Sequence, residues 1–290
     1  MKITGFTIIR NAVKFDYPVI EAICSILPIC DEFIVALGNS EDETETLIQN
    51  INSDKIKIIH TVWDETVRAG GSVLAIETNK AMDAISADTD WCFYIQADEV
   101  LHEKYIPGIK AAMLDHVDDK NVEGLLFNYT HFYGSYEYVA DSPNWYRKEI
   151  RVIRKDSAIR SYKDAQGFRK DGKKLKVKQM DAHIFHYGWV KNPYFQIEKA
   201  KSFNRYWHDD QWLDEQMPKI ELFDYSEIES LTVFSETHPQ VMLKRIHKQN
   251  WNFTFDTNRK RLSVKNRIKV MLESLTGWRP GEYKNYKIIS

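Results

Sequence analysis

The sequence predicts an α/β fold in which a central, mostly parallel sheet is flanked by helices. Two observations lead to this prediction. Short apolar runs alternate with helix-like stretches through the first hundred residues, and unbroken apolar runs are typical of parallel strands buried on both faces. The stretches between the runs are long enough to act as crossover helices. A chain of 290 residues, of which 43% are hydrophobic, is sufficient for one large domain with an appendage.

The first half supplies the alternating strands and helices. We expect strands over 3–9, 33–37, 55–61 and 91–95, with helices over 18–27, 41–52 and 72–87 between them. Asp16 is the expected N-cap of the first helix, and Ser40 with Glu43 is expected to form a capping box at the second. Gly70 and Gly71 precede the third helix.

The second half has a different texture. Aromatic residues and single charges crowd between three further strand-like segments, and an apolar stripe at Phe195, Ala200 and Phe203 indicates a helix. We expect strands over 123–133, 149–154 and 181–187, a helix over 192–208, a loop with short helices over 210–240, and a helical tail.

Cysteine usage and hydropathy exclude several classes of protein. The three cysteines, Cys24, Cys30 and Cys92, form no CxxC pair, which argues against a zinc site and a disulfide framework and favours a reducing, cytosolic setting. The apolar run at the N-terminus is interrupted by Arg10 and Asn11, too early for a signal sequence. Because no run of about 18 apolar residues exists, we expect no membrane span.

Charge is distributed unevenly along the chain. The last 50 residues hold 12 Lys or Arg against 3 acids, an excess of nine positive charges, whereas the first 240 hold 28 Lys or Arg against 39 acids. A basic tail on an acidic body can meet phosphates, anionic lipid or the body itself, and packing against the body is the favoured alternative. Nucleic acid is not an expected partner, because no recognition motif accompanies the charge.

The most informative segment is WCFYIQADE, residues 91–99. Its apolar run ends abruptly at Gln96, Ala97, Asp98 and Glu99, and ligands of open α/β sheets bind at the carboxyl ends of the strands. A carboxylate there can hold a hard divalent cation, which in turn can hold a diphosphate. The alternative is that Asp98 and Glu99 cap a helix that begins near Leu101.

Four segments in order resemble the family 2 glycosyltransferases of the GT-A fold. They are IIRNAV after the first strand, GNSEDET at 38–44, YIQADEVL at 94–101 and IFHYGWV at 184–190. The resemblance implies a GT-A-like, Rossmann-type sheet with a C-terminal helical appendage. It also implies a transferase domain over 1–210, with a nucleotide-sugar half to about 105 and an acceptor half to 210, followed by a C-terminal extension over 211–290.

The resemblance also implies which residues form the donor site. In the matched DxD-like segment, Asp98 would hold Mn²⁺ or Mg²⁺, and His186 would be a further ligand. Gln96 departs from the family pattern, because a neutral amide stands where the first acid is expected and binds a hard cation more weakly. Arg68 and Lys80 are candidates to contact the diphosphate because both lie near the Gly-Gly turn. The complete predicted donor-binding set is Arg10, Asn11, Asn39, Arg68, Asn79, Lys80, Gln96, Ala97 and Asp98.

An inverting transferase needs a general base for the acceptor hydroxyl. We nominate Asp164 in the segment SYKDAQGFR, with Asp141 and Glu149 as rivals. The aromatic-rich segment 129–146 could supply platforms that stack on sugar rings, and we expect Tyr136 and Trp145 to be its exposed, acceptor-binding members.

The expected activity is metal-dependent transfer of a sugar from a nucleotide-sugar donor to a glycan or lipid-linked acceptor, with inversion by single displacement. Two alternatives remain open. A sugar-phosphate nucleotidyltransferase usually has a glycine-rich loop after the first strand, and RNAVKFD has no glycine. A nucleotide-sugar-binding protein without turnover would be consistent with Gln96. We expect a cytoplasmic protein whose basic C-terminus could meet the anionic inner face of a membrane.

Overall fold

The fold is given by a computed structural model that describes residues 1–216 and 222–289. Its N-terminal half is a parallel sheet in the order β3-β2-β1-β4. These strands are β1 (Ile3–Ile9), β2 (Glu32–Gly38), β3 (Ile56–Thr61) and β4 (Trp91–Tyr94). The residues of β1, β2 and β4 are buried throughout, as expected for strands covered on both faces.

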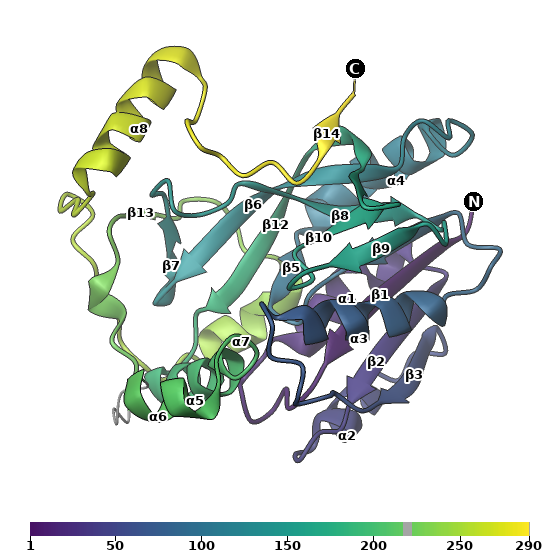
Figure 1. Cartoon of the computed structure of the whole chain (residues 1–290), viewed down its shortest axis with the longest axis horizontal. Helices are drawn as coiled ribbons and strands as arrows, with labels where there is room; N and C mark the ends of the chain where they lie inside the picture. Colours follow the sequence, from purple (N-terminus) through teal and green to yellow (C-terminus); the bar gives the residue numbers. More distant parts are fainter. Residues whose placement is uncertain (217–221, 290) are drawn as a thin grey trace.

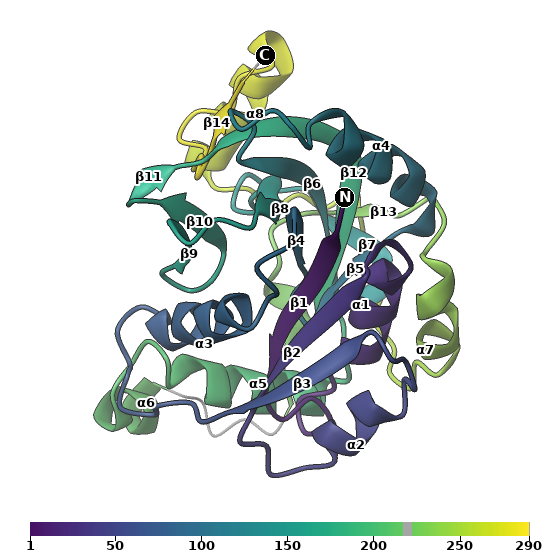
Figure 2. The same ribbon diagram turned by 90° about the vertical axis from the view of Figure 1, so that its right-hand side faces the viewer.

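Helices cover both faces of this parallel sheet. Figure 2 shows α1 (Val19–Ile26) and α3 (Ser72–Asp83) on opposite sides of β1 and β2. Ala22 and Ile23 of α1 belong to one apolar cluster, and Ala81 and Met82 of α3 belong to another. The short helix α2 (Thr44–Gln49) connects β2 to β3. The two apolar cores therefore lie on the two sides of one sheet.

The C-terminal half extends the same sheet with antiparallel strands. Strand β8 (Lys148–Arg154) pairs with β4, and β6 (Gly124–Tyr133) pairs with β8 and β7 (Ser135–Ala140). The long strand β12 (Lys176–Trp189) runs parallel to β6 and antiparallel to β5 (Glu99–Leu101). Within the described ranges the sheet has eleven strands. Because β12 pairs with β5, His186 lies opposite Glu99.

Smaller elements complete the chain (Figure 1). A separate three-stranded sheet packs beside α3. Two further strands from the C-terminal part of the chain join the main sheet, one beside β7 and one beside β12. These elements are η1 (Leu27–Ile29), η2 (Glu103–Tyr105), α4 (Ile106–Asp115), β9 (Ile159–Tyr162), β10 (Gly167–Lys170), β11 (Lys173–Lys174), α5 (Pro193–Asn204), α6 (Asp210–Gln216), η3 (Tyr225–Glu227), β13 (Leu231–Val233), η4 (Gln240–Met242), α7 (Leu243–His247), α8 (Val264–Thr276) and β14 (Lys287–Ile288).

The predicted α/β fold, with helices flanking a central sheet and a helical C-terminal appendage, is confirmed. The parallel pairing lies mainly in the N-terminal half. The predicted loop over 210–240 contains α6, η3 and β13, and residues 217–221 lie outside the described ranges. The domain boundary near 210 stays a prediction. No helix in the described ranges is long and apolar enough to span a bilayer.

Three local predictions are wrong, because tertiary contacts use the residues differently. Asp16 does not cap α1; it adopts a positive φ of 48° and pairs with Arg245. Ser40 and Glu43 form no capping box, and the Ser40 hydroxyl accepts a hydrogen bond from the Asn11 amide at 3.0 Å. The alternative that Asp98 and Glu99 cap a helix is also wrong, because Glu99 lies in β5 and the helical turn η2 begins at Glu103 with His102 as its N-cap.

Candidate functional site

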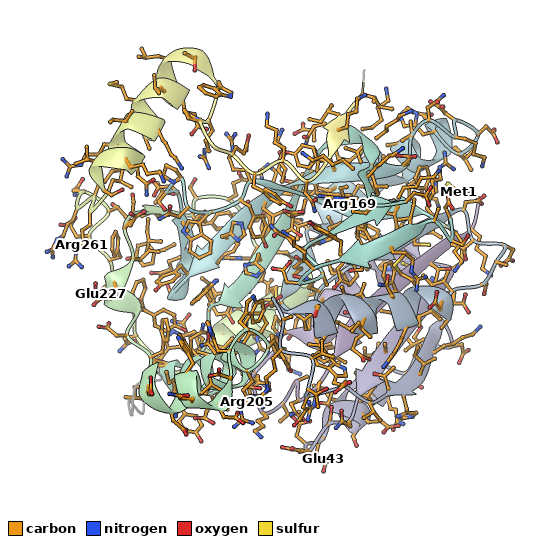
Figure 3. All side chains as sticks on the ribbon, viewed as in Figure 1. Met1, Glu43, Arg169, Arg205, Glu227 and Arg261 are labelled. Atoms are coloured by element: carbon orange, nitrogen blue, oxygen red, sulfur yellow. The ribbon has the colours of Figure 1, made fainter. Side chains whose placement is uncertain are left out.

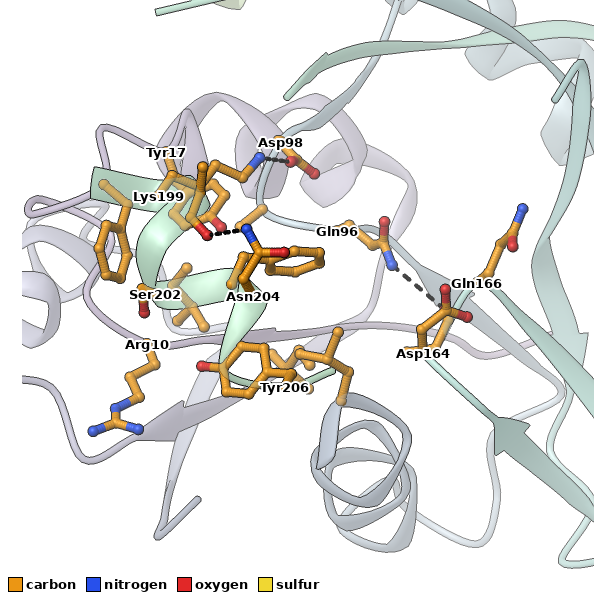
Figure 4. Close-up of a pocket in the computed structure, with 18 of the residues that line it drawn as sticks. Arg10, Tyr17, Gln96, Asp98, Asp164, Gln166, Lys199, Ser202, Asn204 and Tyr206 are labelled. Atoms are coloured by element: carbon orange, nitrogen blue, oxygen red, sulfur yellow. Dashed lines mark hydrogen bonds and ion pairs between the residues drawn. The ribbon is translucent and has the colours of Figure 1, made fainter. Parts of the chain in front are cut away.

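A cavity of about 630 Å³ lies at the carboxyl ends of β1 and β4. The turns after these strands form its floor, and residues of α5 and the segment that follows close it on the other side (Figure 4). Six residues of the predicted site line it: Arg10, Gln96, Ala97, Asp98, Asp164 and His186. The topology thus brings together side chains from four distant segments of the chain, and their roles stay predictions.

Asp98 is the buried anion of this cavity, and its nearest cation is Lys199 of α5. The Lys199 ammonium donates to Asp98 Oδ2 at 3.0 Å and to the Gly188 carbonyl at 3.0 Å. Burial opposes ionisation of Asp98, but Lys199 and the other basic groups around it, among them Lys191, together outweigh burial and hold the pKa of this carboxyl well below its usual range. Asp98 is therefore ionised at neutral pH and paired with an ammonium group.

His186 has its Nε2 atom toward Asp98 and its Nδ1 atom toward His131. Its Nε2 lies 3.8 Å from Asp98 Oδ2, and its Nδ1 lies 3.2 Å from His131 Nδ1. Burial lowers the pKa of His131 to about 3, so that its ring is neutral, and His131 Nε2 donates to the Tyr146 carbonyl at 2.8 Å. His131 Nδ1 must then accept a hydrogen bond from the Nδ1–H group of His186. Burial also lowers the pKa of His186, so that its neutral ring, with the proton on Nδ1, points an unprotonated Nε2 toward Asp98.

Gly188 allows this close approach. A Cβ atom at this position would lie 2.6 Å from Asp98 Oδ2 and 2.7 Å from His186 Nε2. Any larger residue would separate the carboxylate from the imidazole. The glycine of the IFHYGWV segment therefore has a steric role at this site.

Glu99 does not face the cavity. It forms a fully buried, bidentate ion pair with Arg151, with distances of 2.8 and 2.7 Å, and it accepts a hydrogen bond from the Tyr129 hydroxyl at 2.7 Å. Its second oxygen also accepts the backbone N–H of Gln96 at 3.0 Å. Such a network fixes the loop that carries Gln96 and Asp98.

The loop that carries Asp164 is held from the same side. Arg151 donates to the Gln166 carbonyl at 3.0 Å, and the Gln96 side-chain amide lies 3.4 Å from the Ala165 carbonyl. Lys163 and Ala165, on either side of Asp164, have positive φ values of 55° and 60°. Non-glycine residues in this region carry backbone strain, and such strain is concentrated at functional sites.

The two rivals of Asp164 have other surroundings. Asp141 does not line the cavity; its Oδ2 lies 3.6 Å from the Lys260 ammonium. Glu149 is buried, does not line the cavity, and accepts a hydrogen bond from the Gln166 side-chain amide at 2.6 Å. Burial raises the pKa of Glu149 to about 8. A carboxylic acid that is protonated at neutral pH cannot accept a proton there, so Asp164 is the better candidate base.

The raised pKa of Glu149 predicts a pH dependence of stability. Because its folded-state value exceeds the reference of 4.5, its contribution is fully present below that reference and is lost as the pH rises toward about 8. Glu149→Gln, which stays neutral, should gain free energy of unfolding relative to the wild type by roughly 1.4 kcal/mol per pH unit in this window. Urea denaturation at several pH values measures the difference. Parallel pH profiles of the two proteins would contradict the assignment.

Five predicted donor-binding residues lie outside the lining and have other partners. Asn11 Oδ1 accepts a hydrogen bond from the backbone N–H of Glu41 at 2.8 Å, and Asn39 Oδ1 accepts one from the backbone N–H of Trp63 at 3.2 Å. Both residues thereby shape loops beside the cavity. The remaining three have partners outside the cavity lining. Arg68 pairs with Asp210, the Asn79 side-chain oxygen accepts a hydrogen bond from the Ser161 backbone N–H, and Lys80 pairs with Glu77 on its own helix. Their contact with a ligand stays a prediction.

The expected exposure of the acceptor aromatics is wrong for Tyr136. Its side chain is 3% exposed and packs against Tyr187 at a ring distance of 5.7 Å. Trp145 is half-buried and packs edge-on against Trp189, with ring centroids 6.0 Å apart. Neither residue lines the cavity. The role of both in acceptor binding stays a prediction.

Sequence reasoning missed Lys199 and the aromatic wall of the cavity. Lys199 lies in the helix expected over 192–208, three residues after Gln196 and four before Phe203, and all three line the cavity. A lysine on an inward helix face was the available signal. Trp63, Tyr206 and Trp207 form the aromatic wall, and the Trp63 and Tyr206 rings lie 5.8 Å apart. No spacing rule connects residues so distant in sequence.

No protein-family model matches this chain, and no curated protein matches it in sequence. Among solved structures, it is similar to S. aureus TarS, with 13% identity and a TM-score of 0.41 over 70% of this chain and 39% of that one. Residues 1–349 of TarS in complex with UDP give 15% identity and a TM-score of 0.41, over 70% and 64% of the two chains. Glucosyl-3-phosphoglycerate synthase from Mycobacterium tuberculosis, in complex with Mn²⁺, UDP and phosphoglyceric acid, gives 20% identity and a TM-score of 0.30, over 45% of this chain and 43% of that one.

This chain therefore spans less than two thirds of the length of each of these proteins. With TM-scores of 0.41 and below, the similarities establish neither a family nor an activity for this chain.

Proposed function

We propose that this protein is a glycosyltransferase that moves a sugar from a nucleotide-activated donor to a glycan or lipid-linked acceptor, with inversion by single displacement. One observation carries the proposal. Arg10, the Gln96–Asp98 turn and His186 come from three of the segments that resemble family 2 glycosyltransferases, and all line one cavity. Ligands of open α/β sheets bind at this edge.

The cavity has groups suited to a nucleoside diphosphate. The Lys199 ammonium and the Arg10 guanidinium supply positive charge at its lining, although Arg10 also pairs with Glu65 at 2.8 Å. Aromatic rings such as Trp63 and Tyr206 offer faces on which a base can stack. In the proposed mechanism Lys199 would hold the diphosphate and stabilise the charge that develops on it as the sugar departs.

A divalent cation fits the donor set in part. Asp98 Oδ2 and the unprotonated His186 Nε2, 3.8 Å apart, are suitable ligand atoms, whereas no group of three or more His, Cys, Asp or Glu side chains in the described ranges could hold a metal ion. Mg²⁺ is often held by one or two side chains together with substrate phosphates. A cation bound there would stabilise negative charge on the leaving diphosphate.

The chain's own residues would organise the reaction around that site. His131 holds His186 in one tautomer through their 3.2 Å contact, because the hydrogen bond at one ring nitrogen determines which nitrogen is free to bind a metal. Asp164 would accept the proton of the acceptor hydroxyl as the oxygen attacks the anomeric carbon. Gln96 and Arg151 hold the loop of Asp164 through its backbone carbonyls. The turn that carries Asp98 and the loop that carries the proposed base are therefore positioned by the same residues.

A second candidate function is nucleotide-sugar binding without turnover. The Gln96 amide, which replaces an acid of the matched motif, contacts the Ala165 carbonyl and leaves fewer charged ligands for a metal. Incubation with nucleotide sugars and Mn²⁺, followed by assay of the products, separates the candidates. Release of nucleoside diphosphate supports the transferase. Formation of a nucleoside triphosphate and a sugar 1-phosphate only when pyrophosphate is added supports a nucleotidyltransferase, and binding without any of these products supports the binding protein.

A further inference from the structure

Helix α8 is attached to the protein through its polar side. The Asn266 amide donates to Glu229 at 3.0 Å and contacts Asn144 Oδ1 at 3.3 Å. About two turns further on, Glu273 pairs with Arg147 at 2.5 Å and with Arg279 at 2.7 Å. Asn266 is the buried residue of this helix. The contact face of α8 is thus built from hydrogen bonds and ion pairs.

The opposite side of α8 is apolar and faces solvent. Val264, Ile268, Met271 and Leu275 are 74%, 50%, 55% and 74% exposed, and their spacing of three and four residues places them on one stripe. Trp278, two residues after the end of the helix, is 59% exposed. Figure 1 shows α8 projecting from the rest of the fold. A surface helix normally turns such a stripe inward, and a contiguous exposed stripe marks an interaction site.

Positive charge borders the apolar stripe on both sides. At 100° per residue, Lys265 and Arg267 lie about a quarter-turn from its centre in opposite directions. Both are exposed, and neither forms an ion pair within the described part of the chain. Glu273 is the acidic residue of α8, and its carboxylate pairs with Arg147 and Arg279 on the contact face. Figure 3 shows Arg261 and Glu227 below the helix, joined by an ion pair of 4.0 Å.

We propose that α8 is a membrane-surface helix, which lays its apolar stripe among the acyl chains while Lys265 and Arg267 contact anionic lipid headgroups. An exposed apolar face with basic borders and an aromatic residue at its end is the pattern of interfacial helices. A second copy of the chain is a poorer occupant, because its own stripe would bring the same unpaired cations together. The proposal rests on α8 alone and does not depend on the catalytic activity.

The test is co-sedimentation of the full chain with vesicles of phosphatidylglycerol and phosphatidylcholine at low salt, compared with vesicles of phosphatidylcholine alone. The wild type should bind the anionic vesicles at least tenfold more strongly, and binding should weaken as salt is added. Ile268→Glu/Leu275→Glu should lose this binding by tenfold or more. The matched control, Ile76→Glu/Leu114→Glu, places the same charges at exposed apolar positions of α3 and α4 and should retain it.

A second variant tests the basic borders. Lys265→Gln/Arg267→Gln should weaken binding to anionic vesicles while the apolar stripe stays intact. The proposal is overturned if the wild type does not bind anionic vesicles, or if the control loses binding as severely as the α8 variant. It is also overturned if light scattering finds a dimer that Ile268→Glu/Leu275→Glu dissociates, since the stripe would then belong to a second copy.

Discussion

Replacement of Glu99 by glutamine should lower the free energy of unfolding by about 3 to 5 kcal/mol. The carboxylate and the Arg151 guanidinium are both fully buried, so that the neutral amide would leave an uncompensated charge in the interior. The change would also remove an acceptor from the Tyr129 hydroxyl or the Gln96 amide. Urea denaturation at neutral pH measures the loss.

Two further variants make this result specific. Asp83→Asn breaks a pair with Arg160 in which both side chains are exposed, and it should cost less than about 1 kcal/mol. Glu99→Gln/Arg151→Met removes both buried charges and should recover part of the loss. If Glu99→Gln costs no more than Asp83→Asn, the buried pair does not support the loop.

Replacement of Asp98 by asparagine should lower the release of nucleoside diphosphate by roughly 10²-fold or more. Asparagine keeps the size of the side chain but loses the charge that holds Lys199 at 3.0 Å and that would hold a divalent cation. The rate is measured with the nucleotide sugar that the wild type turns over, in the presence of Mn²⁺.

The matched control is Asp88→Asn, which changes an exposed aspartate paired with Lys2 and should leave the rate unchanged. Circular dichroism establishes whether both variants are folded. An unchanged rate in folded Asp98→Asn would remove this residue from the mechanism.

The sequence predicted the parallel half of the fold because its signals are local. The apolar runs define β1, β2 and β4, and the carboxyl ends of these strands meet at one edge by a general rule of α/β sheets. This rule, together with the matched motifs, led to Arg10, Asp98 and His186 as residues of one site, and all three line the cavity.

The rest of the site depends on contacts that no local pattern encodes. Lys80 lies in a correctly predicted helix, yet it pairs with Glu77 on the same helix and not with the cavity. Asp16 and Ser40 are residue types that are common at helix N-caps. In the folded chain, however, Asp16 pairs with Arg245, and the Ser40 hydroxyl accepts a hydrogen bond from the Asn11 backbone N–H. Likewise, the role of Glu99 depends on Arg151, a residue of β8 whose position follows from the pairing of β4 with β8.

The central claim is that the cavity at the ends of β1 and β4 binds a nucleotide, and a thermal-shift titration tests it most directly. The probes are UDP, GDP, CDP and ADP with Mn²⁺, because a ligand that binds only the folded protein raises its melting temperature. We predict that at least one raises the Tm of the wild type and of Ala111→Trp, an exposed control on α4. Ala200→Trp, which fills the cavity, should show no shift. Absence of a shift with every probe, or an equal shift in Ala200→Trp, would contradict the claim.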